Sequence, residues 1–347
     1  YAAFDSATDQ NGNVAIGYNA LTAVTASGDT LCTAVGSQAL AANTAGYHNT
    51  AVGFAAQDAN THGIRNVSVG RDSLGSDTKG SQSVAIGDSA LATQNFTTAT
   101  DSYNTAVGYF AGNAVTTGQY NTFVGNASGD AVTDADENVA VGYNSLSTNT
   151  LGNRTVAIGT GALRDMNFTT ATDSHNTAVG HSSGQAVSTG TNNTFVGSNS
   201  GVANTTGGDN VFMGYRTGDA NTTASGNVAI GKDAFTTNVA GARNTALGTA
   251  TLANMTSATA ANMYNTAVGY GAGTSVTSGT ENTLLGSQAG EALTTGTTNV
   301  ALGSQALKVD TKGNNSIAIG YGALKTQNFS TSTSTGNIAI GYDAGLS

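Results

Sequence analysis

The pentapeptide Asn104-Thr105-Ala106-Val107-Gly108 decides the fold, because close variants of it recur along the whole chain. They include Asn13-Val14-Ala15-Ile16-Gly17 near the start and Asn337-Ile338-Ala339-Ile340-Gly341 near the end. There are nineteen copies, and of the eighteen gaps between their closing glycines thirteen are 17 residues, one is 19 and four are 21. A fixed short period with occasional longer gaps is typical of a solenoid, in which each repeat packs against its neighbours.

The residue types in the motif predict a short β-strand. The second position is Val, Ile or Thr, the fourth is aliphatic or Met, and the third is mostly Ala. Positions two and four lie on one face of a strand, so we expect that face to point into a narrow core and the Ala column to lie on the opposite face. The first position is Asn in fifteen of nineteen copies. Stacked Asn side chains form hydrogen-bonded ladders, and Asn tolerates the turn that precedes a strand.

The closing residue of the motif is Gly in every copy. An invariant Gly within the repeat predicts a corner that needs positive φ or a close approach of two backbones. We therefore assign a structural turn role to the closing glycines, among them Gly17, Gly53, Gly87, Gly108, Gly125, Gly159, Gly180, Gly231, Gly269 and Gly341.

The 17-residue period predicts coils of two short strands and two turns, in an all-β parallel solenoid of about 19 coils over residues 13–347. A leading segment, residues 1–12, precedes them. The longer gaps predict loop insertions near residues 92–103, 164–175, 253–264 and 325–336. Three of these inserts share a sequence, Gln94-Asn95-Phe96, Met166-Asn167-Phe168 and Gln327-Asn328-Phe329, which indicates duplication of a larger unit.

The small residues of the repeat raise the question of how a thin solenoid is stabilised. Each coil contributes few inward aliphatic side chains, so the apolar burial of one chain is small against the entropy of ordering it. The Ala column would let identical strands of neighbouring chains approach closely. We therefore expect a homotrimer around one axis; the alternative is a single-chain solenoid with an exposed Ala-rich face.

Two copies of the motif, Ser83-Val84-Ala85-Ile86-Gly87 and Ser316-Ile317-Ala318-Ile319-Gly320, carry a resemblance to a known family. They resemble the head repeat of YadA-like trimeric autotransporter adhesins, and the resemblance covers essentially the whole chain. It implies a left-handed parallel β-roll in each chain, with three chains around a common axis. The coil here is longer than the usual head repeat of that family.

The longer coil, with its favoured Asn-Thr-Ala-Val-Gly-Tyr form, is similar to the fibre and virion structural proteins of tailed phages, especially those of marine bacteria and cyanobacteria. This resemblance implies a tail fibre or virion appendage that serves as a rigid shaft in host recognition and attachment. The expected partners are further copies of the chain, other fibre or baseplate proteins at its ends, and a host cell-surface glycan or protein. The alternative is a bacterial surface adhesin head that mediates cell adhesion.

Composition and charge exclude several other classes. The formal charge is −10, and the 11 basic residues are scattered, so no basic patch for nucleic acid is expected. No apolar run approaches the ~20 residues that a membrane-spanning helix needs. The single Cys32 takes the place of a motif Asn and is interpreted as buried filler.

No constellation of residues predicts an enzyme, a cofactor or a metal. His48, His62, His175 and His181 fall in or beside turns and are interpreted as solvated. The acidic run Asp134-Ala135-Asp136-Glu137 lacks the glycine and the spacing of calcium loops, so we interpret it as a solvated turn. Carboxylates meeting across chains for glycoside cleavage, and ice binding by rows of Thr, are less favoured hypotheses.

Aromatic residues are the only ligand-binding candidates. The residue after the closing Gly is often Tyr, as at Tyr109, Tyr143 and Tyr270, and three inserts carry Phe96, Phe168 and Phe329. Such rings stack on sugars when exposed. The preferred interpretation is that they pack on the neighbouring coil.

Overall fold

The chain forms a parallel β-solenoid of about 19 turns with a period of about 17 residues. The computed structural model describes residues 12–26, 30–257 and 261–345, so residues 1–11 of the leading segment lie outside the described residues. In these ranges the secondary structure is all β, and no helix is long and apolar enough to cross a membrane. The chain divides into two compact units, Tyr1–His175 and Asn176–Ser347.

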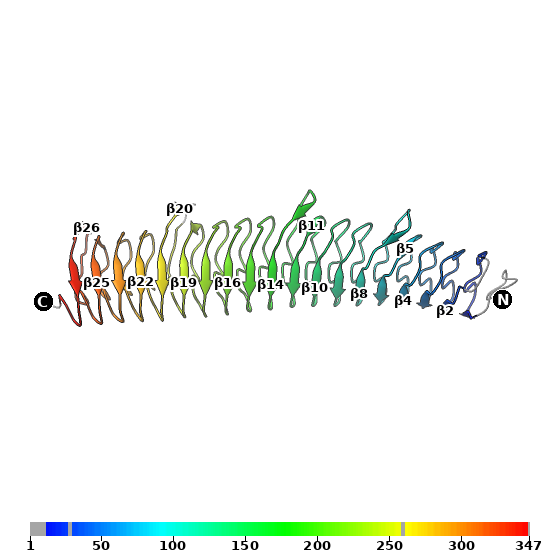
Figure 1. Ribbon diagram of the computed structural model, residues 1–347, viewed down its shortest axis with the longest axis horizontal. Helices are drawn as coiled ribbons and strands as arrows, with labels where there is room; N and C mark the ends of the chain where they lie inside the picture. The colour runs from blue at the N-terminus through cyan, green and yellow to red at the C-terminus, as the bar shows by residue number, and fades with distance from the viewer. Residues whose placement is uncertain (1–11, 27–29, 258–260, 346–347) are drawn as a thin grey trace. The chain divides into compact units, whose positions relative to one another are not determined.

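In each unit the repeat strands are three residues long and follow one another in chain order (Figure 1). Neighbouring strands are parallel and in register, so that Ala106 pairs with Phe123 and Phe195 pairs with Phe212. The described strands of the first unit are β1 (Val14–Ile16), β2 (Thr33–Val35), β3 (Thr50–Val52), β4 (Val67–Val69), β6 (Val84–Ile86), β8 (Thr105–Val107), β9 (Thr122–Val124), β10 (Val139–Val141) and β12 (Val156–Ile158). Those of the second unit are β14 (Thr177–Val179), β15 (Thr194–Val196), β16 (Val211–Met213), β17 (Val228–Ile230), β19 (Thr245–Leu247), β21 (Thr266–Val268), β22 (Thr283–Leu285), β23 (Val300–Leu302), β25 (Ile317–Ile319) and β27 (Ile338–Ile340).

Among the residues that the structure describes, a second strand forms only at the inserts, not in every coil as the sequence suggested. Each insert returns to pair in parallel with the coil before it, as two-residue ladders. These ladders are β5 (Gly80–Ser81) with β7 (Thr100–Asp101), β11 (Gly152–Asn153) with β13 (Thr172–Asp173), β18 (Gly241–Ala242) with β20 (Ala261–Asn262), and β24 (Gly313–Asn314) with β26 (Thr333–Ser334). In the other described coils this side consists of turns and bends.

A Thr hydroxyl holds the start of three inserts in the same way. Thr78 Oγ1 donates to the carbonyl of Phe96 at 2.9 Å, and Thr150 Oγ1 donates to that of Phe168 at 3.1 Å. In the second unit Thr311 Oγ1 donates to the carbonyl of Phe329 at 2.7 Å. The shared insert sequence therefore corresponds to a shared docking contact.

The interior of each coil contradicts the predicted strand orientation. From β2 onward the central residue of every repeat strand is buried, while the first and third residues are partly or fully exposed. The prediction that positions two and four face the core is wrong, and so is the suggestion that the Ala column meets a neighbouring chain. The physical reason is that the coil is thin. Its interior has room for one large side chain, so a small strand residue such as Ala140 points inward and packs beside a buried Leu such as Leu146, both 0% exposed.

Large central residues are accommodated by glycine. Where the strand carries Phe123, Phe195, Phe212 or Leu284, the residue four positions after the closing Gly is Gly in place of Leu. A Cβ built on Gly201 would lie 2.6 Å from the ring of Phe195, and one on Gly218 would lie 2.6 Å from the ring of Phe212. In these four coils, therefore, the glycine leaves the space that the large central side chain fills.

The closing glycines have the backbone that the motif predicted. Their φ angles lie between 124° at Gly320 and 143° at Gly53. A Cβ on Gly53 would also lie 2.4 Å from the carbonyl oxygen of Gly70 in the next coil. Positive φ and close approach of backbones therefore both apply at this corner.

The motif asparagines form a buried ladder. Asn121 Oδ1 accepts the backbone N–H of Asn138 at 3.0 Å, and Asn121 Nδ2 donates to the carbonyl of Ala135 at 2.8 Å. In the second unit Asn282 bonds in the same way to Asn299 at 3.0 Å and to Gly296 at 2.9 Å. Each side chain thus joins the strand entry of the next coil to the end of its own turn.

Candidate functional site

The outward side of the repeat strands is the most extensive candidate surface. We call it the strand face and define it as the first and third residues of each three-residue strand. Every one of these positions holds Val, Ile, Leu, Met or Thr, and none holds a charged residue. Large members are exposed, for example Ile86 at 38%, Leu285 at 43% and Ile340 at 69%. Because the strands pair in register, the strand face is a continuous row within each unit.

The tyrosines after the closing glycines are exposed. Tyr109 is 53% exposed, Tyr143 is 55% exposed and Tyr270 is 63% exposed. Near the end of the second unit Tyr321 and Tyr342 stack on one another with ring centroids 5.3 Å apart. These rings lie on the surface, directly after the turn that closes each strand.

The insert phenylalanines do not share this exposure. Phe96 is 5% exposed and Phe168 is 6% exposed, while Phe329 is half-buried. The rings of Phe96 and Phe168 therefore pack in the interior, which the preferred interpretation expected, and offer no face to a sugar.

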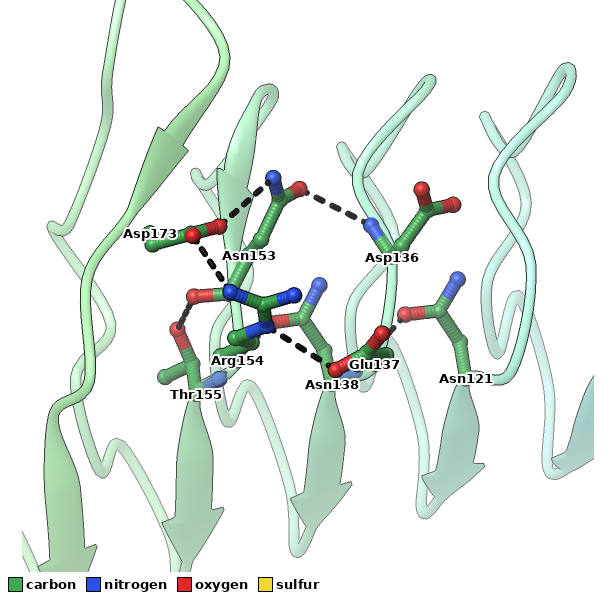
Figure 2. Close-up of polar contacts among 8 residues, drawn as sticks. All are labelled: Asn121, Asp136, Glu137, Asn138, Asn153, Arg154, Thr155 and Asp173. Atoms are coloured by element: carbon green, nitrogen blue, oxygen red, sulfur yellow. Dashed lines mark hydrogen bonds and ion pairs between the residues drawn. The ribbon is translucent and has the colours of Figure 1, made fainter.

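The acidic run at 134–137 is divided among separate partners, and Figure 2 shows those of Asp136 and Glu137. Asp134 accepts hydrogen bonds from the hydroxyls of Thr116 and Thr117. Both bonds lower the pKa of Asp134, and the bond from Thr116 has the larger effect. The backbone N–H of Asp136 donates to Asn153 Oδ1 at 2.9 Å, and Glu137 pairs with Arg154 at 3.0 Å. In the part of the chain that the structure describes, no group of three His, Cys, Asp or Glu residues lies close enough to hold a metal.

The same corner carries further stacked contacts between successive coils. Arg154 also pairs with Asp173 of the insert at 2.5 Å, and Figure 2 shows the two carboxylates on opposite sides of the guanidinium. The groups are 44–51% exposed, so such pairs contribute little to stability. We interpret these ion pairs as contacts that keep neighbouring coils aligned.

The histidines and the cysteine do not lie in an arrangement typical of a catalytic site. His48, His62, His175 and His181 are all exposed. Cys32 is 1% exposed, and its thiol donates to the carbonyl of Thr30 at 3.4 Å. Burial raises the pKa of this thiol, which disfavours the reactive thiolate.

One buried polar network was missed by the sequence analysis. Asp77 Oδ1 accepts the N–H of Gly80 at 2.9 Å, and Asp77 Oδ2 accepts Gln94 Nε2 at 2.6 Å. Gln94 Oε1 in turn accepts Asn104 Nδ2 at 2.9 Å. Burial raises the pKa of Asp77.

The second unit repeats this network with Asp310, Gln327 and Asn337. Gln327 Nε2 donates to Asp310 Oδ2 at 2.7 Å, and Asn337 Nδ2 donates to Gln327 Oε1 at 2.8 Å. The signal was present in the sequence, since in both units an Asp stands 17 residues before the Gln that opens an insert.

Comparisons with known proteins leave this geometry as the main guide to function. No model of a protein family matches the chain, and no curated protein matches it either.

Proposed function

We propose that this chain is the shaft segment of a homotrimeric fibre, most consistent with a phage tail fibre or related virion appendage that takes part in host attachment. Each chain would contribute its strand face to a shared apolar interior. The fibre would act by geometry, because it holds a binding tip away from the particle and presents several copies of it at once.

The observation that carries the proposal is the uncharged, exposed strand face. A contiguous exposed apolar surface on a folded chain is a mark of association. Its residues are β-branched or long aliphatic side chains that leave the interior of their own coil. Covering this face supplies the apolar burial that the thin coil lacks.

The period favours closed association of identical chains. All copies share the same coil register, so parallel chains that match at one coil match at the following coils of the same unit. Cyclic symmetry uses one surface of each subunit repeatedly and leaves no open apolar edge between them. Within each unit, three chains around one axis would place their strand faces inside the assembly.

Two measurements test the proposal. The first is the mass of the native particle in solution, which we expect to be three times the chain mass of 34.2 kDa. The second is immunogold microscopy of the source material with an antibody to residues 97–103, whose tip at Thr97–Ala99 is exposed. We expect gold on virion tails or appendages; gold on bacterial envelopes would instead make the protein an adhesin head.

A further inference from the structure

The chain contains eleven sequences of the form Asn-x-Ser or Asn-x-Thr, the motif that N-glycosylating enzymes accept when x is not Pro. The chain has no Pro, so every copy meets this condition. A chain rich in Asn and Thr contains such sequences by chance, so their surroundings in the fold decide which of them have room for a sugar. The eleven begin at Asn66, Asn95, Asn126, Asn153, Asn167, Asn192, Asn204, Asn221, Asn254, Asn314 and Asn328.

Three of these asparagines are buried and use their amide nitrogen inside the solenoid. Asn66 Nδ2 donates to the carbonyl of Gly80 at 2.9 Å, and Asn204 Nδ2 donates to that of Gly207 at 2.9 Å. Asn221 Nδ2 donates to Asn204 Oδ1 at 2.6 Å. A sugar is bulky and hydrated, so none of these positions can carry one in the folded coil.

Four further copies are occupied in other ways. The amide nitrogens of three of them donate hydrogen bonds: Asn153 to Asp173 at 3.3 Å, Asn192 to Asp209 at 3.2 Å and Asn314 to Ser332 at 3.0 Å. Asn126 is exposed, but the hydroxyl of its motif is not available. Ser128 is buried, and its Oγ donates to the carbonyl of Ala140 at 2.7 Å.

The four remaining copies all lie in the inserts, one in each. In these copies both the Asn and the Ser or Thr two residues later are exposed. Neither the amide nitrogen nor the hydroxyl donates a hydrogen bond within the described part of the chain. The insert segments that pair with β5 and β11 extend beyond the neighbouring coils (Figure 1). The four pairs are Asn95 with Thr97, Asn167 with Thr169, Asn254 with Thr256, and Asn328 with Ser330.

In three inserts the amide group is held by its oxygen alone. Asn95 Oδ1 accepts the hydroxyl of Thr78 at 3.0 Å, and Asn167 Oδ1 accepts that of Thr150 at 2.7 Å. Asn328 Oδ1 accepts the hydroxyl of Thr311 at 3.0 Å. These contacts leave Nδ2, the atom to which an N-linked sugar is attached, free of the fold.

The third insert has its motif at a different place in the coil. Asn254 stands six residues after the closing Gly248, whereas Asn95 stands eight residues after Gly87. The contact with a Thr hydroxyl of the preceding coil therefore does not account for Asn254. The features that all four inserts share are an exposed Asn and an exposed hydroxyl two residues later.

We propose that Asn95, Asn167, Asn254 and Asn328 are acceptor sites for N-linked glycosylation. The co-substrate is a sugar activated as a diphosphate ester. A C–N bond forms between Asn Nδ2 and the anomeric carbon as the C–O bond to the diphosphate breaks; the diphosphate leaves with the electron pair, and the amide nitrogen loses one proton. The inference concerns the inserts and does not rest on the proposed function.

Mass spectrometry of glycopeptides from the native protein tests the proposal. Fragmentation that keeps the sugar attached identifies the modified residue. We expect sugar on the four insert asparagines and none on the buried Asn66, Asn204 or Asn221. A preassembled oligosaccharide would identify a lipid-linked donor and single sugars a nucleotide-linked donor; both results support the proposal.

Substitutions in the first insert, produced in the same cells, separate the motif from general exposure. Thr97→Ala removes the motif hydroxyl but keeps Asn95, so occupancy at Asn95 should fall about tenfold or more. Thr97→Ser retains the hydroxyl and should retain the sugar. Thr98→Ala changes the neighbouring exposed Thr, outside the motif, and is the matched control. The mapping of the wild-type protein stands even if one of these variants fails to fold.

Three outcomes would overturn the proposal. The first is native protein without sugar on any of the four asparagines. The second is undiminished sugar on Asn95 in the Thr97→Ala variant. The third is sugar carried by insert hydroxyls such as that of Thr98 in place of the asparagines, which would make the modification O-linked.

Discussion

The ring of Phe123 occupies the space into which a side chain on Gly129 would project. A Cβ built on Gly129 would lie 2.5 Å from two ring atoms of Phe123. Two coils further on, Ala157 and Leu163 fill the same two positions, both 0% exposed. These two coils therefore fill the same two positions with different pairs, Phe with Gly in one and Ala with Leu in the other.

This relation predicts the behaviour of a double mutant. Phe123→Ala should destabilise the chain by about 3–5 kcal/mol, because it leaves a cavity in the interior. Gly129→Leu alone should destabilise it through overlap with the ring. The double variant restores the Ala with Leu combination, so its free energy of unfolding should exceed the sum of the single effects by at least about 1 kcal/mol. Denaturant titration of the four proteins measures this; strict additivity would contradict it.

The asparagine ladder predicts that substituting a motif Asn lowers stability more than substituting an Asn elsewhere in the same coil. Asn121→Ala leaves the N–H of Asn138 and the carbonyl of Ala135 buried without their partner, and each lost bond costs about 1–3 kcal/mol. Asn126→Ala, at an exposed position of the same coil, should change stability by less than about 0.5 kcal/mol. Equal effects of the two substitutions in thermal unfolding would show that the ladder does not stabilise the coil.

The Asp77 network predicts a pH dependence. Since burial raises the pKa of Asp77, the folded state favours its protonated form. Its contribution to stability is greatest below the ordinary carboxyl pKa and is lost as pH rises through the folded value. Asp77→Asn with Gln94→Met reproduces the Asn149 and Met166 pair of another coil, and the double variant should gain stability relative to wild type between about pH 3 and about pH 7.

Unfolding measured across this pH range, with Gln94→Met as the comparison, tests the network. The single substitution leaves the carboxylate without its side-chain donor and should be the least stable variant at neutral pH. A double variant whose stability relative to wild type does not change with pH would contradict the role of Asp77.

Buried and exposed aromatic residues should differ in their contribution to stability. Phe168→Ala should lower the free energy of unfolding by about 3–5 kcal/mol, since the ring is buried at 6% exposure. Tyr143→Ala, at 55% exposure, should change it by less than about 0.5 kcal/mol. If the two substitutions had the same effect on thermal unfolding, the burial of the insert would not matter to the fold.

The sequence predicted the period, the strand positions and the inserts, because glycine and asparagine are restricted by backbone geometry at each corner. It gave the wrong face of the strand to the core. In a strand as short as Val84–Ile86 the alternation of side chains does not show which face of the strand is buried. The buried face depends on Leu91 and its equivalents, whose side chains enter the interior from the following turn. The Asp77 network was missed because its partners are 17 and 27 residues away in the sequence.

The corrected strand orientation makes the proposed trimer directly testable. If the strand face is the shared interior, Val228→Lys with Ile230→Lys places charges inside the assembly and should dissociate it. Thr223→Lys, at an exposed position on the other side of the same coil, is the matched control.

Sedimentation equilibrium of the wild-type chain and these two variants is the most direct test of the central claim. We predict that wild type and Thr223→Lys have three times the chain mass of 34.2 kDa and that the strand-face variant has the mass of one chain. A wild-type chain that sediments as a folded monomer, or a strand-face variant that remains a trimer, would contradict the account.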